Sequence, residues 1–169
     1  NTNNDLGIAG VCQDCSVIPV RIFRYQNLGG AVIPWSETQV FIDGISWQWQ
    51  IADADISSNS WAVPDNLLAL YPGSDTLVNA VIDAALDEGR NGLGTVMVFS
   101  SGNDGLTDTV PVWPARYERT IAVGATSMCD EHKTNTSCDG ERWWAGKWGE
   151  GLDVSAPGVK VATIDMMGT

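Results

Sequence analysis

Two short segments of this sequence combine small and polar residues in a pattern suited to binding a ligand. Residues 59–62 (Asn-Ser-Trp-Ala) and residues 100–105 (Ser-Ser-Gly-Asn-Asp-Gly) each follow a strand-like stretch. Small residues let a ligand approach the backbone, and Asn103 adds an amide that donates hydrogen bonds. In open α/β sheets, ligands bind beyond the carboxyl ends of the strands, where both segments are expected to lie. Either segment alone also fits an ordinary polar turn.

Four cysteines lie in two close pairs, Cys12 with Cys15 and Cys129 with Cys138. Four cysteines allow three disulfide connectivities, and pairing of near neighbours is the simplest. Two alternatives stay open at this point: a zinc site that draws further ligands from the second pair or from His132, and a set of reduced thiols. Oxidised pairs would indicate an exported protein, because disulfides persist in oxidising compartments.

The spacing of apolar residues predicts which elements position these segments. Residues 37–52 and 75–88 carry apolar side chains at intervals of three and four, which is typical of amphipathic helices. Ser74 is a suitable N-cap for the second helix, and Gly89 is expected to end it. Residues 61–72 and the tryptophan-rich residues 128–150 are expected to be irregular. Strands are predicted at residues 16–23, 55–60, 95–100, 120–125, 152–155 and 159–164.

This order of elements indicates the fold class. Strands that alternate with helices predict an α/β fold, an open and mostly parallel sheet with helices on both faces. The stretch at 95–100 is almost wholly apolar, as expected for a strand that is buried on both faces. A length of 169 residues corresponds to about one domain.

Composition and charge argue against several functional classes. Hydrophobic residues make up 44% of the chain and charged residues 18%, so the chain can form a core. Nine basic against 21 acidic side chains leave a net charge of −12, which repels nucleic-acid phosphates and anionic lipids. No apolar run approaches the roughly 20 residues of a membrane span. We therefore expect neither nucleic acid nor membrane as a partner.

Several stretches, each weakly specific by itself, occur in a recognisable order along the chain. They are residues 3–11, 17–21, 42–47, 55–61, 92–105, 113–117, 121–125 and 152–158. Together they resemble the subtilisin-like serine proteases, or subtilases, over nearly the whole length. The stretches at 55–61 and 92–105 are similar to the kexin and furin branch, and the last three are similar to bacterial secreted members.

This resemblance implies serine endopeptidase activity, with a serine nucleophile, a histidine base and an orienting aspartate. On the subtilase pattern, Asn103 donates the side-chain hydrogen bond of the oxyanion hole. The substrate is an extended peptide or protein, paired along its backbone between two walls. The residues that match these walls are Ser60, Trp61 and Ala62 on one side, and Ser100, Ser101 and Gly102 on the other.

The chain departs from the family pattern around the expected specificity pocket. Ala62 replaces a usual glycine, and Val112 stands at the pocket floor where many members have glycine. Asp65 falls where furin-like members place an acid that binds calcium and basic substrates. The companion acids do not align, since Asp108 is one position off, so the resemblance does not carry over a substrate preference.

The resemblance also implies calcium, a hard cation that takes oxygen ligands. In the first site, Asn4 offers its side chain and the carbonyl oxygens come from Thr2, Leu6 and Ile8. In a second and weaker site, Asp153 offers its carboxylate and the carbonyl oxygens come from Ala115, Tyr117 and Thr120. Asn4 also fits a turn-forming role, and Asp153 also fits a solvated carboxylate.

The catalytic triad of the family has no match in this chain. The one histidine of the sequence, His132, lies in an acidic stretch between two cysteines and does not match the catalytic base. Gly168 and Thr169 resemble the start of the family's Gly-Thr-Ser, but they lie closer to the motif at 152–158 than this motif normally does in the family. We therefore expect residues 1–169 to form the central part of a subtilase catalytic domain, inactive without the remaining protease segments.

Two other functions are kept as alternatives. The first is a non-catalytic peptide-binding module or pseudoprotease that retains the substrate cleft. Trp143, Trp144 and Trp148 also resemble a carbohydrate-stacking surface, although tryptophans in a loop commonly cover the edge of a core. Paired cysteines and the similarity to secreted members predict an extracellular location.

Overall fold

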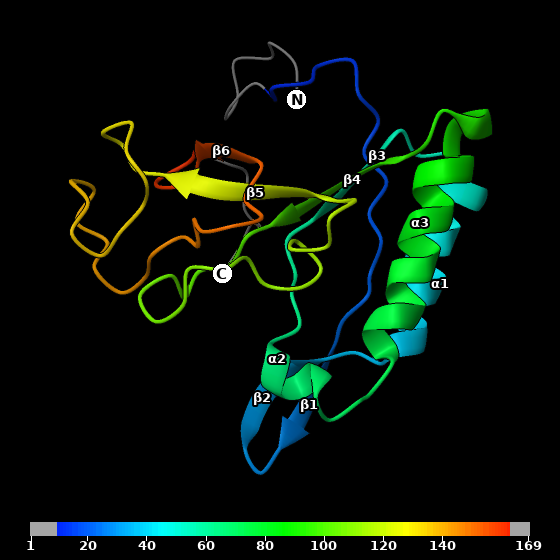
Figure 1. Cartoon of the computed structure of the whole chain (residues 1–169), viewed down its shortest axis with the longest axis horizontal. Coiled ribbons are helices and arrows are strands. Elements are labelled where there is room, and N and C mark those ends of the chain that lie inside the picture. Colours follow the sequence, from blue (N-terminus) through cyan, green and yellow to red (C-terminus); the bar gives the residue numbers. More distant parts are fainter. Residues whose placement is uncertain (1–9, 163–169) are drawn as a thin grey trace, which may run out of the picture.

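The structure is a computed structural model that describes residues 10–162. It contains a parallel sheet of order β3-β4-β5-β6 and a separate antiparallel hairpin, β1-β2 (Figure 1). The elements in chain order are β1 (Arg24–Leu28), β2 (Ala31–Trp35), α1 (Thr38–Gln50), β3 (Ile56–Asn59), α2 (Asp65–Leu68), α3 (Ser74–Gly92), β4 (Val96–Ser100), β5 (Ile121–Thr126) and β6 (Val154–Pro157). The prediction of an open, parallel α/β sheet is confirmed.

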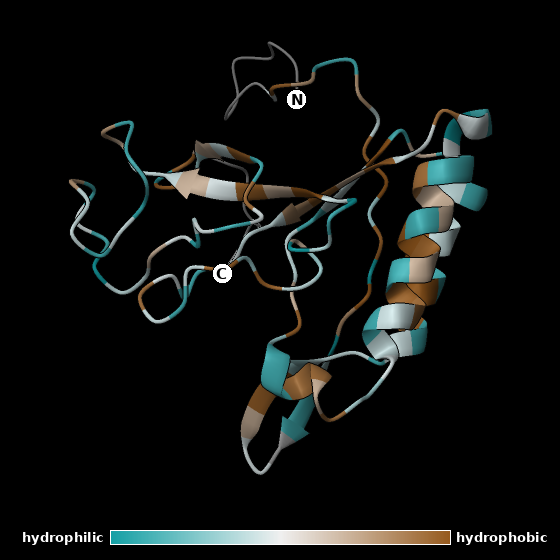
Figure 2. Ribbon diagram, viewed as in Figure 1, coloured by the Kyte–Doolittle hydropathy of each residue, from teal (hydrophilic) through white to brown (hydrophobic). Residues whose placement is uncertain are grey.

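The core lies between one face of the sheet and two long helices, α1 and α3, which run side by side (Figure 1). In Figure 2 both helices carry hydrophobic and hydrophilic residues, whereas β4 is mostly apolar. The buried side chains at this interface are Phe41 and Ile45 from α1, Val78, Ile82 and Ala85 from α3, Met97 and Phe99 from β4, and Ala122 from β5. The 3–4 spacing of apolar residues in the sequence therefore marks the faces that are buried.

The opposite face of the sheet is more open. Ile56, Ile121 and Val154 point to that face and are 62%, 37% and 51% exposed. Within residues 10–162 both long helices cover the same face, so helices cover one of the two faces for which they were predicted. Likewise β4 alternates between buried and half-buried residues, so the expected burial on both faces holds for one face.

The first strand prediction is wrong, and an unpredicted hairpin takes its place. Residues 16–23 form no regular strand: Pro19 lacks a backbone N–H, and these residues pair with no described strand. Instead β1 and β2 pair around Gly29 and Gly30, whose φ angles of 62° and 94° suit a tight turn. The Asn27 side chain accepts a hydrogen bond from the Gly30 amide at 2.9 Å and supports this turn.

Several predicted boundaries also differ from the structure. Helix α3 begins at Ser74 after Gly73 and has no side-chain capping bond, so the predicted N-cap role of Ser74 is wrong. Gly89 leaves the helical conformation as predicted, with ψ of 154°. Residues 61–72 contain the short helix α2, and residues 159–162 form no strand, while 163 and 164 lie outside the described residues. No helix within residues 10–162 is long and apolar enough to cross a membrane.

Residues 128–150, here called the 128–150 loop, are irregular as predicted and are organised around a buried lysine. The side chain of Lys133 is fully buried, and its ammonium donates to the carbonyls of Thr134 and Glu141 at 2.6 and 2.7 Å. It lies 3.4 Å from the buried Asp139 carboxylate and 4.8 Å from the centre of the Trp144 ring. The hydrogen bonds and the ion pair of this one ammonium therefore stabilise a loop that lacks the regular hydrogen bonds of a helix or strand.

We expect Lys133→Met to lower the free energy of unfolding by about 3–5 kcal/mol, because it leaves the buried Asp139 carboxylate without a positive charge beside it. Urea unfolding followed by tryptophan fluorescence measures this loss. Lys160→Met is the matched control, since Lys160 is exposed, and its loss should stay below about 0.5 kcal/mol. A loss for Lys133→Met as small as that of the control would contradict the role of this lysine.

Candidate functional site

The two candidate binding segments meet at one edge of the sheet. Strands β3 and β4 are parallel neighbours, so the residues that follow them leave the sheet at the same edge. Together they border a cavity of about 730 Å³, here called the cleft. The predicted site residues that line it are Ser60, Trp61 and Ala62 after β3, and Ser100, Gly102 and Asn103 around the end of β4. The two predicted walls therefore face a common space, except at Ser101.

Ser101 has a different environment from its neighbours. Its side chain is buried, and its hydroxyl donates a hydrogen bond to the Lys147 carbonyl at 3.0 Å. Its amide donates to Val123 of β5, and its carbonyl accepts from Val112. Ser101 is thus engaged on the inner side of the wall, where it ties the wall to the 128–150 loop.

Asn103 lies at the rim of the cleft with its side chain exposed. Its side-chain amide makes no hydrogen bond to the described residues, whereas its carbonyl accepts one from Ala145 at 3.4 Å. The backbone on both sides of it is also paired with the 128–150 loop, through Gly102 with Lys147 and Gly105 with Ala145. Asn103 therefore combines a held backbone with an amide that is available to a ligand.

Gly102 is required by its conformation and by its neighbours. Its φ of +112° lies in the region that glycine adopts without steric cost. A Cβ at this position would come within 3.2 Å of the Lys147 side chain and of a Val112 methyl group. The backbone wall of the cleft is thus packed from behind by Val112 and Lys147.

The Trp61 ring is fixed between the cleft and the core. It stacks on Phe41 of α1 with ring centres 4.4 Å apart, and meets Phe99 and Trp113 edge-on at 5.4 and 6.3 Å. Its indole N–H donates to the Asn59 side chain at 3.0 Å. Aromatic contacts of this kind restrict the ring to one orientation, which positions the backbone of the first wall.

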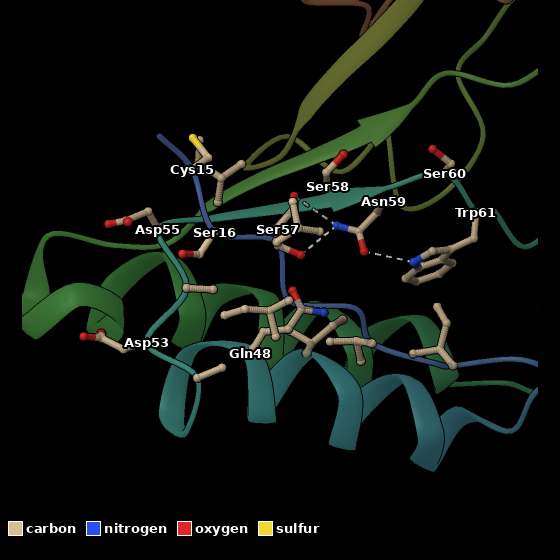
Figure 3. Close-up of a pocket in the computed structure, with 18 of the residues that line it drawn as sticks. Cys15, Ser16, Gln48, Asp53, Asp55, Ser57, Ser58, Asn59, Ser60 and Trp61 are labelled. Carbon is tan, nitrogen blue, oxygen red and sulfur yellow. Dashed lines mark hydrogen bonds between the residues drawn. The ribbon is translucent and has the colours of Figure 1, made fainter. Parts of the chain in front are cut away.

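Asn59 holds the end of β3, and the sequence analysis placed it in a candidate segment without assigning it a role. Its buried amide donates to the hydroxyl of Ser57 at 2.9 Å, and its oxygen accepts from Trp61 (Figure 3). The same amide donates to the Val98 carbonyl of β4 at 3.2 Å. This side chain crosslinks two strands and the wall residue. The sequence signal that could have indicated this role is a polar residue at a core-facing position of a strand, since buried polar groups are normally hydrogen-bonded.

Charged side chains are paired at the far end of the cleft. Arg116 binds the Asp65 carboxylate through both terminal nitrogens, one of them at 3.1 Å, and this hydrogen bonding lowers the pKa of Asp65. Lys147 binds Asp108 at 2.6 Å, and that hydrogen bond likewise lowers the pKa of Asp108. Both carboxylates therefore stay ionised at neutral pH and below.

A second hollow, here called the groove, follows the free edge of β3 (Figure 3). Its volume is about 920 Å³, and it lies between β3, helix α1 and the extended residues 14–23. In the described residues β3 has a strand partner, β4, on one side only. Ser60 and Trp61 line both the groove and the cleft, so the two hollows meet at the end of β3.

The second predicted calcium site has ligands of suitable chemistry. The carbonyl oxygens of Ala115 and Tyr117 both accept a hydrogen bond from the Thr120 hydroxyl, at 3.3 and 2.8 Å, so the two oxygens lie around that side chain. Asp153 is exposed, and one of its carboxylate oxygens accepts the Ala122 amide at 2.8 Å. Carboxylate and carbonyl oxygens are the ligand types that a hard cation takes. Thr2, Asn4, Leu6 and Ile8, the first predicted site, lie outside the described residues.

The remaining candidates lie away from the cleft-lining residues. The structure contains both disulfides of the local pairing, Cys12–Cys15 and Cys129–Cys138, so these cysteines are not zinc ligands. His132 is half-buried against Trp148, and burial lowers its pKa. It does not line the cleft.

The three loop tryptophans do not form one stacking surface. Trp144 donates its indole N–H to Glu141 at 2.8 Å and lies under the Lys133 ammonium, whereas Trp143 is 74% exposed. Trp144 thus packs within the loop, and Trp143 and Trp144 also line the cleft. This arrangement favours a covering role over carbohydrate binding.

Comparison with known proteins gives a consistent result. The model of the subtilase family matches residues 1–169. Subtilisin E from Bacillus subtilis is 28% identical over 99% of this chain and 36% of its own length, and a subtilisin from Bacillus pumilus is 27% identical over 99% and 50%. An extracellular protease from Xanthomonas campestris is 27% identical over 99% of this chain and 25% of its own length. The chain thus spans half or less of the length of these relatives.

A solved structure supports the fold. The prenylagaramide maturation protease superposes with a TM-score of 0.50 over 75% of this chain and 39% of its own, at 20% identity. At this identity the likeness concerns the fold alone.

We expect Gly102→Ala to lower the free energy of unfolding by about 2–4 kcal/mol, since it adds both backbone strain and a close contact with Lys147 and Val112. Gly140→Ala is the matched control, because Gly140 also has positive φ but open space around it. The control should lose about 1 kcal/mol, the cost of strain alone. Thermal unfolding of the two variants separates the cost of backbone strain from the cost of the close contact. Equal losses of unfolding free energy would show that packing behind Gly102 is unimportant.

Proposed function

Because this chain belongs to the subtilase family, we propose that it forms the substrate-binding part of a serine endopeptidase. The observation that carries this proposal is the meeting of both candidate segments at one cleft, with the exposed amide of Asn103 at its rim. The substrate is an extended peptide or protein that pairs with the backbone of the two walls. Such pairing binds the main chain with little demand on sequence.

Asn103 acts on the scissile carbonyl. Its neutral N–H donates to the oxygen that becomes negative when the carbonyl is attacked, and a donor held in place lowers the energy of that charge. The pairing of Gly102 and Gly105 with the 128–150 loop supports this role, because it restrains the backbone on both sides of Asn103. The side chain has no competing partner among the described residues.

The nucleophile, the base and the orienting aspartate come from protease segments outside these 169 residues. The chain spans 36% of the length of Subtilisin E, which leaves room for such segments in an intact protein. The groove beside β3 supports their docking, since it offers an unpaired strand edge to an added strand. Residues 1–169 alone are then the central part of the catalytic domain and hydrolyse no peptide.

We place the intact protein outside the cell. Two disulfides close short segments of the chain, and disulfides persist in oxidising compartments. One relative carries the name extracellular protease. The net charge of −12 supports a protein without nucleic-acid or membrane partners.

In the intact protease, Asn103→Ala should lower kcat by about 10²–10³-fold with little change in KM, a loss measured for this type of donor in subtilisin itself and carried over from it. Hydrolysis of a chromogenic peptide under saturating and limiting substrate measures both constants. Asn135→Ala, an exposed asparagine in the 128–150 loop, is the control and should leave both unchanged.

The same assay distinguishes the alternative function. If the intact protein binds an extended peptide through the cleft but cleaves none, it is a non-catalytic peptide-binding module or pseudoprotease. If Asn103→Ala retains full kcat in an active protease, the oxyanion role is wrong. Hydrolysis by the isolated 169-residue chain would contradict the need for further segments.

We also propose that calcium stabilises the chain through Asp153 and the carbonyls of Ala115, Tyr117 and Thr120, and through Asn4 with its neighbouring carbonyls. Excess EDTA should lower Tm, by about 2–4 °C for each kcal/mol of binding free energy. Asp153→Asn keeps an acceptor for the Ala122 amide but removes the charge, so it should reduce this response, as should Asn4→Ala. A Tm that is unchanged by EDTA in the parent chain would rule out both sites.

A further inference from the structure

Lys147 is a charged residue of the cleft whose role is not explained by the oxyanion and substrate-wall functions. Its side chain is 3% exposed, although its ammonium lies among the groups that line the cleft. The ammonium is 2.6 Å from an Asp108 oxygen and 3.6 Å from an Asp104 oxygen. A buried ammonium of this kind is held in one place and serves as a fixed charge.

The backbone and the stem of Lys147 hold this charge in position. The Lys147 amide donates to the Gly102 carbonyl at 3.0 Å, and its carbonyl accepts from the Ser101 hydroxyl at 3.0 Å. The methylene stem fills the space directly behind Gly102. The backbone bonds thus fix where the side chain starts, and a movement of the ammonium away from Asp108 would lose the packing of the stem behind Gly102.

The charges around the cleft are nearly balanced. Three carboxylates and two cations line it, which leaves a net charge of −1: Asp65, Asp104 and Asp108 against Arg116 and Lys147. The carboxylate side chains are 53–67% exposed, whereas Lys147 lies beneath them. Without the ammonium the net charge would be −2, and Asp104 and Asp108 would have no cation bound to them among the described residues.

Asp65 is not free to select a basic substrate. Arg116 already binds both oxygens of its carboxylate. A substrate cation at the end of the cleft would thus compete with Arg116 for Asp65, and with Lys147 for Asp108. Uncharged side chains meet no such competition, and Trp61, Val112 and Trp144 offer them apolar surface.

We propose that Lys147 determines the substrate preference of the cleft: its fixed ammonium binds Asp108 and lies close to Asp104, which offsets one of their two negative charges, so that the cleft accepts uncharged side chains in preference to basic ones. The inference rests on the proposed peptidase function and names its substrate class. Lys147 lies outside the family motifs found in the sequence, and the proposal makes it the residue that sets the charge-dependent part of substrate specificity.

The test compares two peptides that differ only in the residue before the cleaved bond, leucine or lysine, with the intact protease. The parent enzyme should have the higher kcat/KM for the leucine peptide. Lys147→Met removes the charge and keeps a stem of similar shape, so it should raise the lysine-to-leucine ratio of kcat/KM by about tenfold. Lys147→Arg retains the charge and should keep the ratio of the parent.

A second variant changes the charge in the opposite direction. Asp108→Asn alters an exposed side chain and should lower the lysine-to-leucine ratio several-fold. Lys160→Met, which removes the charge of an exposed lysine that does not line the cleft, is the control and should leave the ratio unchanged. If Lys147→Met fails to fold, the Asp108→Asn result decides the matter.

The outcomes separate this inference from the proposed function. A parent enzyme that prefers the lysine peptide, or a ratio that neither Lys147→Met nor Asp108→Asn changes, overturns the inference while the peptidase function stands. If no form of the protein cleaves either peptide, the proposed function fails. The ratio of the two peptide dissociation constants, measured by tryptophan fluorescence, then tests the charge effect with the same expected directions.

Discussion

The packing of Trp61 is the contact on which the candidate site depends most. Its ring touches Phe41 of α1, Phe99 of β4 and Trp113, and its N–H is bound by Asn59 of β3. One side chain thus joins a helix, two strands and a later loop at the point where β3 ends. Because so large an apolar surface is costly to expose, the direction in which the chain leaves β3 is fixed by the core.

The second wall is positioned in a different way, by charge and backbone hydrogen bonds. Two buried lysines of the 128–150 loop position it. Lys133 binds carbonyls within the loop. Lys147 connects the loop to the wall at Gly102 and to the acids of the cleft. An irregular segment has few hydrogen bonds of its own, and a buried ammonium supplies several donors at one point. The cleft is therefore rigid on both sides for different physical reasons.

The open parts of the sheet bear on how the chain functions. One face carries exposed apolar residues such as Ile56 and Val154, and the edge of β3 borders the groove. Edges and faces of this kind are normally covered in a folded protein, because unpaired strands and apolar patches invite association. The groove meets the cleft at Ser60 and Trp61, so a segment bound in the groove would reach the place where the substrate is expected.

The sequence by itself determined the helices α1 and α3, the strands β3 to β5 and the two segments that follow strand ends, because each depends on local periodicity or local residue type. Near-neighbour disulfides were predicted for the same reason. Only the tertiary structure decided that Ser101 is buried, that Asn59 crosslinks two strands, and that Lys147 meets Asp108 across 39 positions of the chain. These features depend on contacts between segments distant in sequence, and no local pattern records which distant partner a polar side chain will find.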